Sequence, residues 1–152
     1  MSKLKLSAAA ALMALLPLAT AHADLPGKHP AYLHALSDLR AARFLIERRP
    51  GDAAVSTHED LALTQIDYAI KDIRDAAIDD GKNVHDHPPV DVDPDRRGHL
   101  HKALELLRQV HDEVDREEDD PAVRELKHHS LEHIDAALHE TEAAIRDVEL
   151  HR

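Results

Sequence analysis

The sequence contains no cysteine, and only two tyrosines and one phenylalanine supply aromatic rings to its 152 residues. Without cysteine the chain cannot form a disulfide, an iron–sulfur cluster, a thiolate zinc site or a covalently attached c-type haem. With so few aromatic rings, a core must be built from Leu, Ile, Val and Ala, which suits closely packed helices. These absences exclude thiol chemistry and favour an all-α protein.

Long hydrophobic runs are also missing, apart from one near the amino terminus. Lys3 and Lys5 precede an apolar run over residues 6–18, and Ala21-His22-Ala23 offers the small residues of a signal-peptidase cleavage site. A run of that length is too short to span a bilayer, which takes about 20 residues. We expect residues 1–23 to be a Sec-type signal peptide, so that residues 24–152 act in the periplasm or are secreted, without a membrane anchor after cleavage.

Positive charge is scarce, and methionine is confined to the predicted signal. Lys and Arg number 19 against 30 Asp and Glu, a formal net charge of −11 that falls to −13 when the two signal lysines are removed. So acidic a surface repels phosphate backbones, and nucleic acid is therefore not an expected partner, whereas metal cations or basic proteins are. Loss of Met1 and Met13 excludes a Met-rich Cu(I) site and His/Met-ligated haem.

Apolar residues recur every three or four positions in four segments, the spacing of one face of a helix. These stripes are Tyr32, Leu36, Leu39 and Ile46; Leu63, Ile66, Ile70, Ile73 and Ala77; Leu100, Leu104, Leu107 and Val114; Leu131, Ile134, Leu138, Ile145 and Val148. Ser56-x-x-Glu59 is a capping box for the second helix, and Gly81 marks its end. Other predicted helix ends carry Pro30, Pro50-Gly51, Asp93-Pro94 and Asp120-Pro121. The pattern predicts hairpins over 30–81 and 94–151, joined by a link at 82–93.

The two predicted hairpins align with each other at an offset of 68 residues. The alignment of 32–84 with 100–152 needs no gap and contains 14 identities, most of them at apolar helical positions. Identities also occur in the turn, where Arg48 and Asp52 align with Arg116 and Asp120. The sequence therefore predicts an internal repeat. We expect one all-α domain, an up-and-down four-helix bundle built from two duplicated helical hairpins.

Histidine is abundant, at 14 residues, one of them in the predicted signal. The first candidate metal site is the link set, His85 and His87 in the link with His99 and His101 at the start of the next helix. Because a loop can fold back on a helix start, this set can supply three or four nitrogens to one Cu(II), Ni(II) or Zn(II) ion. Ordering a loop costs about 1–2 kcal/mol per residue, a cost large enough to cancel that advantage. The sequence therefore favours the link only narrowly over helix four as the tighter site.

Aspartates in the same link match part of a calcium-binding motif. Asp91, Asp93 and Asp95 match the opening positions of an EF-hand loop. Arg96 and Lys102 replace the Gly and Glu that the loop needs, so calcium is not expected by this route. The alternative interpretation of the link is a solvated connection whose aspartates cap the next helix.

The second candidate metal site is the helix-four set, His128, His129 and His133, with Glu125 or Glu132 as a further donor. His129 and His133 are four residues apart, so that their rings lie one turn apart on one face. By the helical step both lie roughly 90° to 130° from the apolar stripe and should flank the core. The alternative is a solvated face with Glu–His pairing.

His111 differs from the other histidines because it falls on the apolar stripe of the third helix, at the position that aligns with Arg43. A polar residue at the same level in both halves indicates either a buried site or a satisfied polar residue near a bundle end.

No enzyme motif is present. A di-iron bundle needs two inward Glu-x-x-His motifs, whereas Glu125-x-x-His128 alone has this spacing, and it points outward. The sequence contains no nucleophile elbow, phosphate loop or His-Glu-x-x-His motif. We therefore do not expect an enzyme.

The segment Leu126-Lys-His-His-Ser-Leu-Glu-His-Ile-Asp-Ala-Ala-Leu-His, with the export signal and the lack of cysteine, resembles the small histidine-rich metal-binding proteins of bacterial periplasms. The resemblance covers about residues 125–144 and is compositional, since the His-x-x-Glu-Ala repeats of those proteins are absent. It implies a helical bundle that holds Cu, Ni or Zn ions. Residues 32–40 and 77–83 also resemble an exported bacterial helical family, which implies no activity. Two functions follow as expectations: buffering of divalent transition metals, or a helical interaction or stress-chaperone-like module that works without metal.

Overall fold

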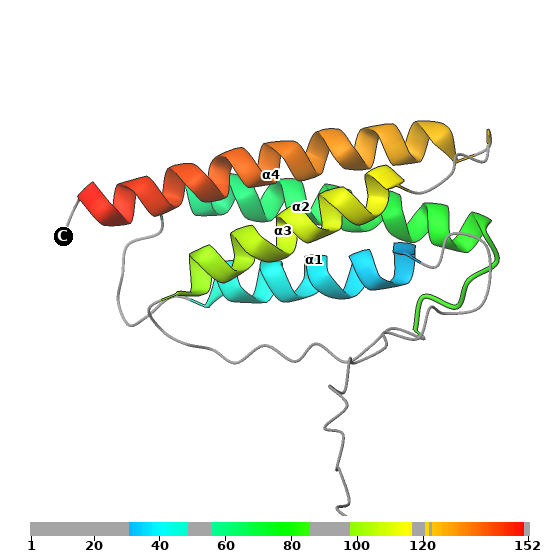
Figure 1. Ribbon diagram of the computed structural model, residues 1–152, viewed down its shortest axis with the longest axis horizontal. Coiled ribbons are helices and arrows are strands. Elements are labelled where there is room, and N and C mark those ends of the chain that lie inside the picture. Colours follow the sequence, from blue (N-terminus) through cyan, green and yellow to red (C-terminus); the bar gives the residue numbers. More distant parts are fainter. Residues whose placement is uncertain (1–30, 49–55, 86–97, 117–120, 122, 151–152) are drawn as a thin grey trace, which may run out of the picture.

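The computed structural model describes residues 31–48, 56–85, 98–116, 121 and 123–150. They form four helices, α1 (Ala31–Glu47), α2 (Thr57–Asp79), α3 (His99–Arg116) and α4 (Arg124–Leu150), and no strand (Figure 1). For this part of the chain the predicted all-α four-helix bundle is confirmed. None of these helices is both long and apolar enough to cross a membrane. The predicted signal peptide lies outside the described residues.

Both ends of α2 have the local structure that the sequence predicts. The Ser56 hydroxyl accepts a hydrogen bond from the Glu59 amide, and the Glu59 carboxylate accepts one from the Ser56 amide, each at 3.1 Å. At the other end Gly81 has φ 74°, a conformation that glycine adopts without strain, and the Lys82 amide donates to the Ala77 carbonyl at 2.9 Å. The predicted boundaries at Pro30, Pro50-Gly51, Asp93-Pro94 and Asp120 lie outside the described residues.

The core includes most of the predicted apolar stripes, although Leu63, Ile70, Leu131 and Leu138 are only partly buried. Its largest fully buried apolar side chains are Tyr32, Leu36, Leu39, Leu45, Ile46, Ile66, Ile73, Leu107, Val110, Val114 and Ile134. Complete burial of one such side chain stabilises the fold by about 1.5–3 kcal/mol relative to its exposure. One stripe position was predicted wrongly: Val148 is 41% exposed, because it lies near the end of α4, the longest helix.

The helices form a four-sided arrangement in which each helix contacts two others. α1 packs on α2 and α3, and α4 packs on α2 and α3, whereas the pairs α1–α4 and α2–α3 lie on the diagonals without contact. Within each hairpin the two helices are antiparallel, as predicted. The link, however, joins two helices that run in the same direction, since α2 and α3 both start at the left end of Figure 1. The end of α2 and the start of α3 therefore lie at opposite ends of the bundle.

Positions that align at the offset of 68 residues also have similar contacts and burial in the structure. In α1 and α2, Arg43 Nε donates to Asp67 Oδ1 at 2.7 Å. At the aligned positions of α3 and α4, His111 Nε2 lies 3.4 Å from Asp135 Oδ1. Aligned core positions are buried in both halves: 32/100, 35/103, 36/104, 39/107, 42/110, 46/114, 66/134, 69/137 and 76/144. The two hairpins are therefore the same structural unit used twice.

Candidate functional site

The link set is not gathered in one place by the described residues. His85 is exposed and follows α2, where its amide donates to the Asn83 side chain at 3.2 Å. His99 and His101 lie in the first turn of α3, at the opposite end of the bundle (Figure 1). Their spacing of two residues also directs their rings to different sides of the helix. His87 lies outside the described residues.

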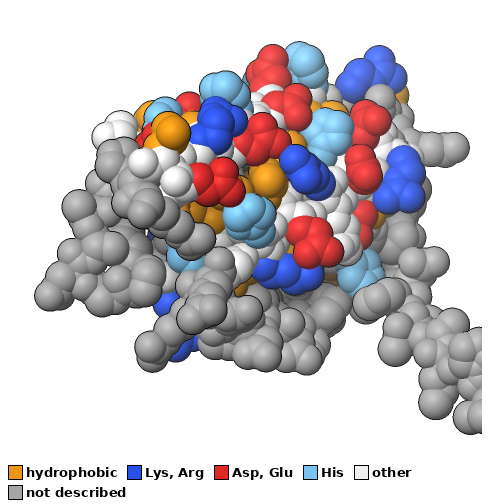
Figure 2. Space-filling view, turned by 60° about the vertical axis from the view of Figure 1, so that its left-hand side comes forward, with side chains coloured by type: hydrophobic (Ala, Val, Ile, Leu, Met, Phe, Trp, Pro, Cys, Tyr) orange, Lys and Arg blue, Asp and Glu red, His pale blue; other side chains and the backbone are white. Residues whose placement is uncertain are grey.

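The helix-four set lies on the flank of α4, as predicted. His128 and His129 are exposed, and their ring centroids lie 6.2 Å apart. His128 Nε2 lies 3.4 Å from Glu132, one turn later on the same helix. In the face shown in Figure 2, histidines lie among acidic and basic side chains on the surface. His128 and His129 are therefore accessible to an ion in solution.

His133 turns toward α2 instead of outward. Its Nδ1 lies 2.8 Å from the Oε1 atom of Gln65, and its Nε2 lies 4.0 Å from Asp72 Oδ2. The Tyr68 ring packs at 5.0 Å between centroids. Gln65 and His133 are aligned positions of the two hairpins, so this contact joins equivalent positions of α2 and α4. The ring is fixed by contacts on three sides.

His58, which the sequence analysis missed, makes the second contact of this kind. Its Nδ1 lies 2.6 Å from Glu140 Oε2, and its Nε2 lies 4.0 Å from Asp147 Oδ2. The capping box at Ser56 fixes the turn of α2 that carries it. The sequence does not show which residues contact His58, because both partners lie more than 80 residues away.

His58 and His133 belong to one row of polar side chains, which we name the α2–α4 seam. Its members are His58, Gln65 and Asp72 on α2 and His133, Glu140 and Asp147 on α4. The spacing of seven residues on both helices places each set on one helical face. This spacing is the sequence signal that could have found His58. The spacing can be read from the sequence, but the register of α2 against α4 cannot.

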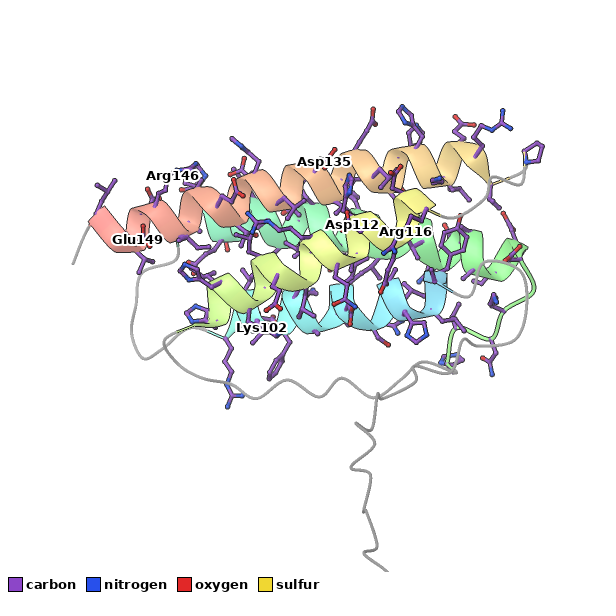
Figure 3. The ribbon with its side chains drawn as sticks, in the orientation of Figure 1. Lys102, Asp112, Arg116, Asp135, Arg146 and Glu149 are labelled. Carbon is purple, nitrogen blue, oxygen red and sulfur yellow. The ribbon has the colours of Figure 1, made fainter. Side chains whose placement is uncertain are left out.

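The contacts within each hairpin use a different chemistry. Arg43 bonds Asp67 and Glu47, both at 2.7 Å, and the hydrogen bond with Asp67 is the main cause that raises the pKa of Arg43. His111 lies between Asp112 and Asp135, at 3.8 and 3.4 Å (both aspartates are labelled in Figure 3). The His111 side chain is 32% exposed, so it is a satisfied polar residue and not a buried site.

Few side chains that could bind one metal ion lie close together on the seam. Among the described residues, no group of three or more His, Asp or Glu side chains is arranged to hold one ion. At His58 the two carboxylates approach opposite ring nitrogens, so that one ion can bind the ring and Asp147 but not Glu140 as well. An ion here would complete its coordination with water.

Comparison of the chain with family models, with curated proteins and with solved structures finds no match. Support for a function therefore comes from the residues and their geometry.

Proposed function

We propose that this protein binds and buffers divalent transition-metal ions, Cu(II), Ni(II) or Zn(II), in the periplasm, and that it is not an enzyme. The helix-four set, His128, His129 and His133, is the site we favour. The observation that carries the proposal is the environment of His133, which leaves one ring nitrogen available beside a carboxylate.

The contact with Gln65 determines which nitrogen of His133 is available. An amide oxygen can only accept a hydrogen bond, so Nδ1 donates to Oε1 and the neutral ring keeps its lone pair on Nε2. Zinc bonds an imidazole nitrogen and a carboxylate oxygen at about 2.0–2.2 Å each. The 4.0 Å gap from Nε2 to Asp72 therefore admits one ion with little side-chain movement.

Further donors lie within one turn. His129 precedes His133 by four residues on α4 and offers an exposed imidazole nearby, although no three donors are arranged around one ion among the described residues. Imidazole with carboxylate is a donor set that suits Zn(II), Ni(II) and Cu(II). The separation of His85 from His99 and His101 supports helix four, and not the link, as the tighter site. Metal binding by the link set remains a prediction, since His87 lies outside the described residues.

Paired variants test the proposal by calorimetric titration of residues 24–152, which contain every described helix. His129→Ala with His133→Ala should weaken the tightest Cu(II) or Zn(II) step at least tenfold, about 1.4 kcal/mol. His85→Ala with His87→Ala should change it by less than about threefold. The control is His139→Ala, because His139 is an exposed histidine of the same helix.

The reverse ranking of the two double variants would move the site to the link. Wild-type affinity in both would mean that neither set binds the ion. The expectation of a metal-independent interaction module would then be the better account. The exposed large apolar residues that such a module would offer are Phe44, Leu61, Tyr68, Ile78, Val148 and Leu150.

A further inference from the structure

His58 lies between two carboxylates of the other hairpin. It stands in the first turn of α2, where Glu140 and Asp147 of α4 approach its two nitrogens at 2.6 and 4.0 Å. The Glu140 side chain is 21% exposed, whereas those of His58 and Asp147 are 40% and 44% exposed. Glu140 is therefore the more buried of the two carboxylates and Asp147 the more exposed.

The hydrogen bond to Glu140 fixes the tautomer of the neutral ring. A carboxylate oxygen accepts, so that Nδ1 donates and the lone pair stands on Nε2, the nitrogen that faces Asp147. A histidine that binds a metal usually donates its other N–H to a carboxylate or carbonyl, which orients the ring and makes it more basic. At His58 the carboxylate that accepts this hydrogen bond is Glu140.

The same arrangement occurs twice on the α2–α4 seam. His133 donates from Nδ1 to Gln65 and presents Nε2 to Asp72 at 4.0 Å, as His58 presents Nε2 to Asp147. The contact at His58 has the stronger hydrogen-bond acceptor on Nδ1, an anionic carboxylate instead of an amide oxygen. By this comparison His58 has at least as strong a donor nitrogen as His133.

We infer that His58 and Asp147, with Glu140 orienting the ring, form a second binding site for a divalent transition-metal ion, and that this ion joins α2 to α4. The inference uses the ligand chemistry of the proposed function but none of the residues of its site. An ordinary His–Glu ion pair predicts the same contact to Glu140 and no role for Asp147 toward a metal, which makes the two accounts separable.

The test follows the imidazole ¹⁵N resonances of each histidine while Zn(II) is added to residues 24–152. We expect Nε2 of His58 to shift on binding while Nδ1 stays protonated. Asp147→Asn and Glu140→Ala should each weaken this step about tenfold, the lower end of the loss seen for groups around a metal site. His139→Ala is the matched control and should leave the step unchanged.

Each outcome decides the inference separately from the proposed function. If the His58 resonances stay constant during the titration, the inference is wrong, whatever His133 does. A His58 shift that survives Asp147→Asn at wild-type affinity also overturns it, because the carboxylate is then not a ligand. A His58 shift with constant His128, His129 and His133 resonances would sustain the inference and reject the helix-four site.

Discussion

The two interfaces between the hairpins, α1–α3 and α2–α4, are built from different side chains on the same duplicated framework. The buried residues of α1 and α3 are mainly large and apolar, such as Leu39 and Leu107. Those of α2 and α4 include many small residues, such as Ala69 and Ala137, with histidine–carboxylate contacts along the edge. Both interfaces therefore bury apolar residues, and the α2–α4 interface adds histidine–carboxylate contacts along its edge.

The largest expected effect on stability comes from a substitution in the α1–α3 interface. Leu107 is fully buried in α3, and Leu107→Ala should lower the free energy of unfolding by about 2–5 kcal/mol, because it removes buried methyl groups and leaves a cavity. Urea unfolding measures this loss. Zn(II) affinity of the folded variant should stay within about twofold of wild type. A large loss of affinity in the folded variant would mean that the two interfaces are not independent.

The next effect concerns the seam. An ion that binds the folded bundle and not the unfolded chain stabilises it, by about 2.7 kcal/mol for one site at 100 times its dissociation constant. Zn(II) should therefore raise the urea midpoint of the wild type. In the variant His58→Ala with His133→Ala this increase should vanish. Because the variant also loses the hydrogen bonds to Glu140 and Gln65, its midpoint in chelator should be lower than that of the wild type, and the Zn(II) effect is measured against its own curve in chelator. An equal Zn(II) effect in this variant would place the ion elsewhere.

A smaller effect separates the aligned ion pairs of the two hairpins. Arg43→Ala removes two short charge pairs and should cost about 0.5–1 kcal/mol, the range of partly exposed pairs. His111→Ala removes longer contacts and should cost less than about 0.5 kcal/mol. Neither should change Zn(II) affinity, because neither residue belongs to the seam. Unfolding in urea with and without Zn(II) checks both statements, and an equal loss in the two variants would contradict the difference in geometry.

The smallest effect belongs to a pair within one helix. Partial burial works to raise the pKa of Asp75, but hydrogen bonds from Lys71 and Arg74 outweigh it and leave the pKa below its ordinary value. A lowered folded pKa stabilises the protein above the unfolded pKa, and the contribution is lost as the pH falls through the folded value. Asp75→Asn should therefore cost a few tenths of a kcal/mol at pH 7 and nothing near pH 2, since solvent screens this exposed pair. Equal costs at both pH values would exclude an electrostatic origin.

The sequence predicts the fold because helix formation and burial follow local periodicity. The capping box at Ser56, the turn at Gly81 and the stripe through Leu36 and Leu39 each depend on neighbours a few residues away. The repeat likewise predicts that Arg43 and His111 occupy equivalent places.

Features that depend on packing between distant segments were beyond sequence reasoning. The partners of His58 follow from the register of α2 against α4, which side-chain packing sets only when the hairpins meet. The direction of α3 has the same origin, and it separates His85 from His99 although only 13 residues lie between them in the chain. The flank position of His133 was predictable from the helical step, but its contact with Gln65 was not.

Calorimetric titration of residues 24–152 with Cu(II), Ni(II), Zn(II) and Ca(II) at pH 7.5 and 5.5 tests the central claim most directly. Imidazole must be neutral to bind a metal, and histidine in general titrates near about pH 6.5. We expect dissociation constants below about 10 μM for at least one transition metal at pH 7.5, at least tenfold weaker binding at pH 5.5, and no comparable binding of Ca(II). Flat isotherms for all four ions at pH 7.5 would contradict the account.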